Sequence, residues 1–298
     1  MFRKIIAVLV SLVLFIFTGS NGAPKHTVLN EDECILSAAV ISDVHIEGNN
    51  FPRYKTFARI LKDAKNTERK NDVAVFLGDN TMNGQGIESL LFYGTLAITD
   101  IADEYVTVVG NHDVGNGEGS YDRLFDRFSK FNKTTLGMKL EKPYYYKVIN
   151  GCYFITIGPE DLCVYEMPVS DEQMDFLDET LALAQKDGAP AFVCAHHPYW
   201  EVESDRIFDI LTKYENVFYI SGHTHWFVEE GWTFTTEDGI NEINLPRCTE
   251  LGENDREVFD GTGYAVQLEV YKDEVVGRVR NFYTGEWEES LEYHFPLV

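Results

Sequence analysis

Short apolar runs alternate with amphipathic stretches along most of the chain. The almost wholly apolar runs predict strands over 34–42, 72–77, 105–109, 191–195 and 217–220. Helical patterns of hydrophobic spacing lie between them, over 54–66, 86–102, 120–131, 170–186 and 205–214. Strands that are this apolar have to be covered on both faces. The pattern therefore predicts an α/β protein with helices outside the sheets.

Two hairpins interrupt this alternation. Asn150-Gly151 separates two strand patterns, over 144–149 and 152–157, and this dipeptide is the strongest short hairpin signal. After residue 226, the segments 264–271 and 274–282 predict a hairpin that turns at Lys272-Asp273, and 291–295 predicts an edge strand. Because neither a repeat nor a low-complexity linker occurs, we expect one domain over 34–298. It would have two packed sheets and an antiparallel C-terminal portion.

The N-terminus has the order of regions found in a secretory signal peptide. Arg3 and Lys4 precede an apolar stretch over 5–17, and small residues follow over 18–23. We therefore expect a signal peptide over 1–22, with cleavage after Gly22 or Ala23. The apolar stretch is shorter than the roughly 20 residues of a membrane span. The sequence predicts a secreted or extracytoplasmic protein without a membrane span after processing, and an uncleaved membrane anchor is the alternative.

Composition limits the partners of this protein. The 298 residues include 49 acidic and 25 basic ones, so the formal net charge is −24. Such a surface repels polyanions, and we expect no binding to duplex nucleic acid. Five cysteines are present, an odd number that leaves at least one unpaired. Cys152 and Cys163 could form a bridge, whereas Cys194 lies in an apolar run and is expected in the core.

Residues that bind metals follow the strand-like runs at five places. These segments are Asp43-Val44-His45, Gly78-Asp79-Asn80, Gly110-Asn111-His112-Asp113, His196-His197-Pro198 and Ser221-Gly222-His223-Thr224-His225. Ligands of open α/β sheets bind beyond the carboxyl ends of the strands, so the five segments are expected to converge. The twofold alternation of an extended chain would also place Asp43 and His45 on one side, and likewise His223 and His225.

These residue types indicate a particular chemistry. A mixture of imidazoles and carboxylates suits zinc, manganese or iron. Two divalent ions about 3.5–4 Å apart, joined by a bridging carboxylate, are the usual arrangement for cleaving phosphoesters. If Asp43 and Asp79 are the only anionic ligands, two divalent ions retain positive charge. That charge would attract a phosphate and lower the pKa of a bridging water, which gives a hydroxide nucleophile.

The five motifs DxH, GD, GNHD, HxP and GHxH resemble, in this order, those of the calcineurin-like metallophosphoesterase family, over about residues 38–226. The resemblance implies a β-sandwich of two mixed sheets flanked by helices. It also implies a first metal held by Asp43, His45, Asp79 and His225, and a second held by the bridging Asp79, Asn111, His196 and His223. His112 would lie outside the metal ligands as the general acid. His196 is preferred to His197 because HxP places the ligand two residues before the proline.

One departure from the family pattern narrows the choice of metal. Many members carry GDxxDxG, but Met82 stands here at the position of the second aspartate. Purple acid phosphatases carry a tyrosine at the same position, so a tyrosinate-ferric site is disfavoured. The GNHD form and the compact size are similar to the phosphodiesterase-type branch of the family rather than to its protein-phosphatase branch.

Together these features predict an exported phosphoester hydrolase, a phosphatase or phosphodiesterase, with two divalent metal ions and a small phosphoester substrate. A nucleotidase or nuclease of the same family is one alternative, and a non-catalytic surface protein that retains the fold is another. Asp113 would either orient His112 or cap the following turn. Tyr199 and Trp200 would either form an apolar wall for a substrate group or lie at the edge of the core.

Overall fold

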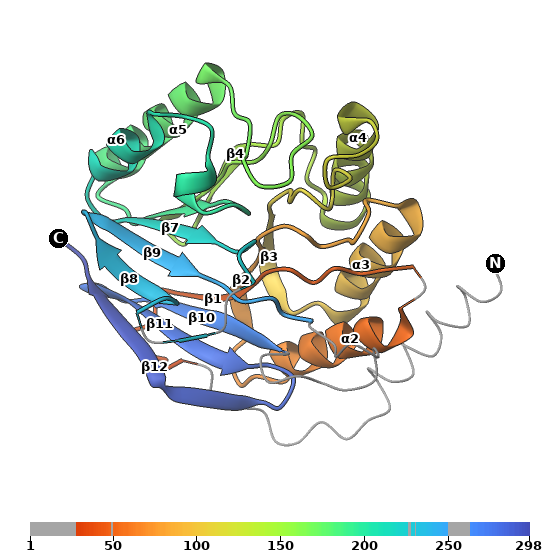
Figure 1. Cartoon of the computed structure of the whole chain (residues 1–298). Coiled ribbons are helices and arrows are strands. Elements are labelled where there is room, and N and C mark those ends of the chain that lie inside the picture. Colours follow the sequence, from red (N-terminus) through yellow and green to blue (C-terminus); the bar gives the residue numbers. More distant parts are fainter. Residues whose placement is uncertain (1–27, 49, 226–227, 230, 250–262) are drawn as a thin grey trace.

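Two six-stranded sheets lie against each other, and helices cover their outer faces (Figure 1). The computed structural model describes residues 28–48, 50–225, 228–229, 231–249 and 263–298. The expected signal peptide over 1–22 lies outside these residues. Among the residues that are described, no helix is long and apolar enough to cross a membrane.

The first sheet has the strand order β12-β11-β10-β1-β2-β3. Its strands are β1 (Leu36–Ile41), β2 (Asn71–Phe76), β3 (Ala102–Thr107), β10 (Tyr264–Val270), β11 (Glu274–Asn281) and β12 (Glu286–Pro296). The strands β1, β2 and β3 run parallel, whereas β10, β11 and β12 add antiparallel partners beside β1. The carboxyl ends of three parallel strands therefore meet at one edge of this sheet.

The second sheet has the strand order β4-β5-β6-β7-β9-β8. Its strands are β4 (Tyr145–Ile149), β5 (Cys152–Thr156), β6 (Ala191–Cys194), β7 (Val217–Ser221), β8 (Phe234–Glu237) and β9 (Ile240–Asn244). The inner strands β5, β6, β7 and β9 are parallel, and β4 and β8 are antiparallel edge strands. The two sheets are both mixed, as the family resemblance predicts.

The main core lies between the sheets. Val40 and Val75 of the first sheet join Phe154, Phe192 and Phe218 of the second in one cluster of fully buried side chains. The three phenylalanines stack across neighbouring strands, with ring centroids 5.1 and 5.2 Å apart. Burial of each such side chain contributes roughly 1.5–3 kcal/mol. This packing holds the two sheets at a fixed distance and so fixes the positions of the loops at their carboxyl ends.

Helices form the outer layers. Their bounds are α2 (Phe51–Lys65), α3 (Gly86–Thr99), α4 (Tyr121–Phe131), α5 (Asp171–Asp187) and α6 (Ile207–Thr212), with a π-helical turn (Asn132–Leu136) and a 3-10 turn (Tyr199–Glu201). The helices α2 and α3 cover the first sheet, and α5 and α6 cover the second (Figure 1). Their buried side chains pack on these sheets. Asn50 and Ser170 cap α2 and α5 by accepting hydrogen bonds from backbone amides of the first turn.

The order of elements and both predicted hairpins are confirmed, with differences at the boundaries. The helix expected over 86–102 ends at Thr99, because Asp100 is left-handed and Ala102 already begins β3. The hairpin β8–β9 was not predicted, although its Asp238-Gly239 turn has the residues and the positive φ angles of a hairpin turn. All five cysteines are free and buried, so Cys152 and Cys163 form no bridge.

Candidate metal centre

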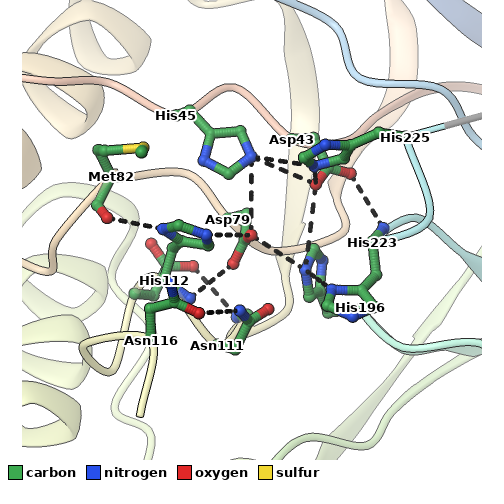
Figure 2. Close-up of polar contacts among 12 residues, drawn as sticks. Asp43, His45, Asp79, Met82, Asn111, His112, Asn116, His196, His223 and His225 are labelled. Carbon is green, nitrogen blue, oxygen red and sulfur yellow. Dashed lines mark hydrogen bonds and ion pairs between the residues drawn. The ribbon is translucent and has the colours of Figure 1, made fainter. Parts of the chain in front are cut away.

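The five motif segments converge at the carboxyl ends of the parallel strands. Asp43 and Asp79 follow β1 and β2 of the first sheet, while His196 and His223 follow β6 and β7 of the second. Their side chains point toward one another, together with those of His45, Asn111, His112 and His225 (Figure 2). All eight candidate site residues are therefore gathered in one place, contributed by both sheets.

The backbone conformation at the motif residues differs from the extended one that the sequence predicts. The expected strand alternation is wrong here, because β1 ends at Ile41 and β7 ends at Ser221, before the motif residues. Instead, Asp43, His45, Asp79, His223 and His225 all have positive φ angles, between 48° and 66°. Left-handed conformations of residues other than glycine cost about 1–3 kcal/mol each and cluster at functional sites. Turns, rather than pleated strands, direct these five side chains inward.

A first group of ligand-type atoms surrounds one oxygen of Asp43. Its Oδ1 lies 2.9 Å from His225 Nε2 and 3.5 Å from His45 Nε2. The other oxygen, Oδ2, accepts hydrogen bonds from Ser42 Oγ and from the backbone amide of His223. His45 Nε2 also lies 3.6 Å from Asp79 Oδ2. Hydrogen bonds to Oδ2 thus hold the Asp43 carboxylate in place, and Oδ1 faces the imidazoles of His45 and His225.

A second group shares Asp79 with the first. Asp79 Oδ2 lies 3.2 Å from His196 Nε2, and His196 Nε2 lies 3.3 Å from His223 Nδ1. His196 Nδ1 donates a hydrogen bond to the carbonyl oxygen of Leu77, which turns Nε2 toward the centre. Within each of the two groups the ligand-type atoms lie within 4.8 Å of one another. Asp79 is therefore the residue that both groups share.

Asn111 would add an amide oxygen to the second group. Its Nδ2 donates to Asn116 Oδ1 at 2.8 Å, and its Oδ1 is buried without a hydrogen-bond partner among the described residues. A buried carbonyl oxygen without a partner is costly unless a donor or a cation satisfies it. The donor set of two carboxylates, four imidazoles and this oxygen fits two divalent cations.

Two glycines let the loops approach the carboxylates closely. A Cβ atom at Gly222 would lie 2.0 Å from Ser42 Oγ and 2.5 Å from Asp43 Oδ2. A Cβ atom at Gly110 would lie 2.2 Å from Asp79 Oδ1. The glycines of the GNHD and GHxH motifs are therefore required by the space beside the candidate ligands.

Electrostatics keep the carboxyl groups ionised. Burial alone would raise the pKa of Asp43 and Asp79, but His196 and the other nearby imidazoles outweigh it and hold both pKa values well below the usual range. Burial lowers the pKa of His45 to about 4, and burial together with His196 lowers that of His223 to about 4. Anionic carboxylates and neutral imidazoles are the forms that bind metal ions.

His196 responds to the two carboxylates in the opposite way from His45 and His223. Burial lowers its pKa, but Asp79 and Asp43 overcome that effect and raise the pKa to about 9. A divalent cation would replace the His196 proton as the counter-charge of the carboxylates. His197 is fully buried, with its ring centroid 4.3 Å from that of His223, so it packs behind the centre.

His112 lies at the open side of the centre. Its ring Nδ1 is 2.8 Å from the carbonyl oxygen of Met82, and its Nε2 is 4.0 Å from Asp79 Oδ2 (Figure 2). The backbone amide of His112 donates to Asp79 Oδ1 at 2.9 Å. Its side chain is 17% exposed, more than those of Asp79 or His196. The imidazole is thus oriented by the backbone while the side chain remains partly exposed.

Asp113 joins two loops and does not orient His112. Its carboxylate accepts from the backbone amides of Asn80, Thr81 and Gly110 and from Thr81 Oγ1. Burial and the charge of Asp79 raise the pKa of Asp113 to about 6. Neither expectation is therefore confirmed: the carboxylate contacts the GD loop and Gly110, rather than the His112 side chain or the turn that follows.

Sequence reasoning missed several supporting residues. Glu201 Oε2 lies 3.4 Å from His223 Nε2, and Asn116 holds the amide of Asn111. Asn244 Oδ1 accepts a hydrogen bond from Thr224 Oγ1, between the two histidines of the GHxH motif. The run Gly115-Asn116-Gly117 contains a tight-turn signal that would have drawn attention to Asn116. No comparable local signal marks Glu201 or Asn244, which reach the site through the fold.

Comparison with known proteins decides the family. The family model of the calcineurin-like phosphoesterases matches residues 36–227. The chain belongs to this family. A probable glycerophosphodiester phosphodiesterase, GpdQ, from Arcobacter nitrofigilis is 24% identical over 279 residues, which cover 85% of this chain and 95% of that protein.

Solved structures support the fold assignment. A dimetal phosphatase from Danio rerio is 14% identical with a TM-score of 0.58, over 89% of this chain and 100% of that one. The purple acid phosphatase PPD1 from yellow lupin is 16% identical with a TM-score of 0.61, over 88% of this chain and 53% of that one. With the family match and the ligand clusters, the chain is a metal-dependent phosphoester hydrolase.

Proposed function

We propose that the protein is a binuclear phosphodiesterase that hydrolyses small phosphodiesters outside the cytoplasm. The observation that carries this proposal is the position of Asp79, whose Oδ2 lies near His45 of one ligand group and His196 of the other. Asp43, His45, Asp79 and His225 would hold the first ion, and Asp79, Asn111, His196 and His223 the second. Manganese, zinc or iron suits this mixed set of donors.

Two divalent cations in these positions would supply the hydroxide nucleophile that the sequence predicts and would neutralise charge on the phosphoryl oxygens. The chain itself would supply the general acid. Because Nδ1 of His112 donates to the Met82 carbonyl, the proton that His112 can deliver is the one on Nε2. Transfer of that proton to the departing alkoxide leaves a neutral imidazole, which the same backbone contact keeps in place.

Preference for diesters is supported by the relative from Arcobacter nitrofigilis, which the chain matches over 95% of that protein's length. A diester carries one negative charge, so the acidic surface opposes its approach less than that of a monoester or a polyanion. The same surface opposes long nucleic acids, which disfavours a nuclease.

Export is the second part of the proposal, supported by Arg3, Lys4 and the apolar stretch over 5–17. Sequencing the N-terminus of the protein recovered from outside the cytoplasm of its source cells would test it. We expect a mature N-terminus near residue 23 or 24. Recovery from the cytoplasm with Met1 retained would contradict export without affecting the enzymatic proposal.

Metal dependence and diester preference can be tested in one experiment. The protein is dialysed against a chelator and assayed with bis(p-nitrophenyl) phosphate and p-nitrophenyl phosphate, before and after addition of Mn²⁺ or Zn²⁺. We expect no turnover without metal, and restored turnover with a higher kcat/KM for the diester. Turnover that persists after chelation would overturn the mechanism, and a higher kcat/KM for the monoester would overturn the diester preference.

A further inference from the structure

A pocket of about 330 Å³ lies beside the metal centre and has no role in the proposed hydrolysis. Its walls come from the 3-10 turn that follows Pro198, from the turn at 231–232 and from the β8–β9 hairpin. Five of the residues that line it are Tyr199, Trp200, Trp232, Glu242 and Asn244, and we call this group the aromatic subsite.

The aromatic subsite adjoins the second ligand group. Asn244 lines it and accepts a hydrogen bond from Thr224, which separates His223 from His225. Trp200 lines it as well, and the next residue, Glu201, has Oε2 3.4 Å from His223 Nε2. The pocket is thus linked to the surroundings of His223 in two ways, through Asn244 and through Trp200. A phosphodiester at the metal centre would therefore place one of its ester groups within reach of the subsite.

The walls of the subsite combine aromatic rings with a carboxylate. Trp200 is 47% exposed and Trp232 is 52% exposed, and both residues line the pocket. Aromatic faces attract cations through the negative potential above the ring, and indole does so best. Tyr199 adds a third ring, whose centroid lies 5.2 Å from that of Trp200.

Glu242 supplies the charge that such a ligand needs. Its Oε1 is buried and has no hydrogen-bond partner within the part of the chain that is described. Burial, with a further contribution from Glu237, raises the pKa of Glu242 to about 7. A buried carboxylate oxygen without a partner is unfavourable, and a cation in the pocket would remove that cost. A neutral apolar group would leave this cost unchanged.

We propose that the aromatic subsite binds the ammonium group of an amino-alcohol phosphodiester, with the rings around the cation and Glu242 as its counter-ion. This inference rests on the proposed function, since it assigns the substrate class of the same centre. The Nδ2 of Asn244, which is buried without a partner among the described residues, would donate to an oxygen of the ester that links the ammonium group to phosphorus.

Two chromogenic diesters that differ in one atom test the subsite. The choline ester of p-nitrophenyl phosphate carries a quaternary nitrogen, and its 3,3-dimethylbutyl ester carries carbon at the same position. Both release p-nitrophenol, so a difference in kcat/KM reports recognition of the charge. For the manganese-loaded full chain we expect the choline ester to be favoured about tenfold, the size of a desolvated cation–π contact with an ion pair. Equal kcat/KM values would overturn the inference.

Variants assign the preference to the subsite. Glu242→Gln keeps the shape of the side chain and removes its charge, and Trp232→Leu removes one exposed ring. We expect each to lower the choline preference several-fold, whereas Glu289→Gln, which neutralises an exposed glutamate on β12, keeps the full preference. An unchanged ratio in both Glu242→Gln and Trp232→Leu would overturn the inference.

Binding of choline chloride to the metal-free protein separates this inference from the proposed function. Calorimetry of the chelated protein should show binding that Glu242→Gln weakens about tenfold. If the metal-loaded protein hydrolyses neither ester but the chelated protein binds choline in this way, the proposed function fails and the subsite stands. If both esters are hydrolysed and choline does not bind, the subsite fails and the proposed function stands.

Discussion

His112 Nδ1 lies 2.8 Å from the carbonyl oxygen of Met82, so a backbone atom orients the candidate general acid (Figure 2). The Met82 side chain is directed elsewhere, with its sulfur 3.9 Å from Arg53 Nη1. Met82 replaces the second aspartate of the GDxxDxG pattern, yet any residue at this position has the carbonyl that holds His112. The departure from the family pattern therefore leaves the orientation of His112 intact.

Substitution His112→Ala should separate catalysis from metal binding. Since His112 lies outside both ligand groups, we expect bound metal to remain at the wild-type level. Loss of a general acid lowers kcat roughly 10²–10⁴-fold. Metal analysis by mass spectrometry, together with kcat for a diester with an alkyl leaving group, would measure both effects. A p-nitrophenyl ester should lose less, because its leaving group needs no proton.

Met82→Leu is the matched control for His112→Ala. It retains the carbonyl and a similar side-chain volume, so we expect kcat within about twofold of wild type. A loss as large as that of His112→Ala would show that the sulfur, rather than the carbonyl, sets the position of the imidazole. Metal loss in His112→Ala would place this residue among the ligands.

The GHxH glycine should be required for the first metal. In Gly222→Ala, the new methyl group would lie 2.5 Å from Asp43 Oδ2 and 2.0 Å from Ser42 Oγ, so the loops have to separate. We expect Gly222→Ala to weaken metal binding at least tenfold and to destabilise the fold by about 1–3 kcal/mol. Titration of the metal-free protein with Zn²⁺ and denaturant unfolding would measure the two effects.

Gly86→Ala serves as the comparison for that substitution. Gly86 is the first residue of α3, and a Cβ atom there would meet only Arg127 Nε at 3.8 Å, an ordinary contact. We expect wild-type metal affinity, with stability equal to or slightly above wild type because alanine favours helices. Equal metal affinity of Gly222→Ala and Gly86→Ala would contradict the close approach.

Most of the fold and the membership of the site follow from the sequence, because strand patterns and motifs are local. The apolar runs before Asp43 and His223 predicted β1 and β7, and the motifs that follow these two strands lie together in the structure, as expected. The backbone conformation at the site was not predictable. An extended chain with alternating side chains was expected, but five motif residues adopt left-handed conformations. Such turns are set by contacts between loops, such as the hydrogen bond from His45 N to Asp79 O.

The aromatic subsite shows the other limit of sequence reasoning. Tyr199 and Trp200 were singled out as a possible wall for a substrate group, because they follow the HHP motif directly. Trp232 and Glu242 were not, since Glu242 lies on a hairpin that the strand patterns did not predict and Trp232 lies in the turn before that hairpin. The pairing of β9 with β7 places Glu242 beside Tyr199 and Trp200, and this pairing is visible only in the structure.

The two histidines of the GHxH motif should belong to different ions. His225 lies in the group with Asp43 and His45, whereas His223 lies in the group with His196. We expect His223→Ala and His225→Ala each to retain about one metal ion per chain, and Asp79→Asn to lose both, because Asp79 belongs to both groups. Mass spectrometry under native conditions would count the ions. Loss of both ions in each histidine variant, with the fold retained by circular dichroism, would contradict the division.

Glu242 should destabilise the free protein in a pH-dependent way. Its pKa in the folded chain, about 7, is above the ordinary glutamate value, so the native state binds the proton more tightly than the unfolded state does. The free energy of unfolding should therefore fall as the pH rises from about 4.5 to about 7. Glu242→Gln removes this loss, and we expect the variant to be more stable than wild type by about 1–3 kcal/mol at pH 8 and equal to it at pH 4.5.

Urea unfolding of the chelated wild type and of Glu242→Gln at the two pH values would measure this difference. Titration of the metal-binding residues affects both proteins alike and cancels in the comparison. Glu289→Gln should show no pH-dependent difference, since that carboxyl is exposed. Choline should stabilise the wild type at pH 8 and have less effect on Glu242→Gln, because a cation removes the cost of the buried charge. A Glu242→Gln variant that is less stable than wild type at pH 8 would show that the carboxylate already has a partner in the fold.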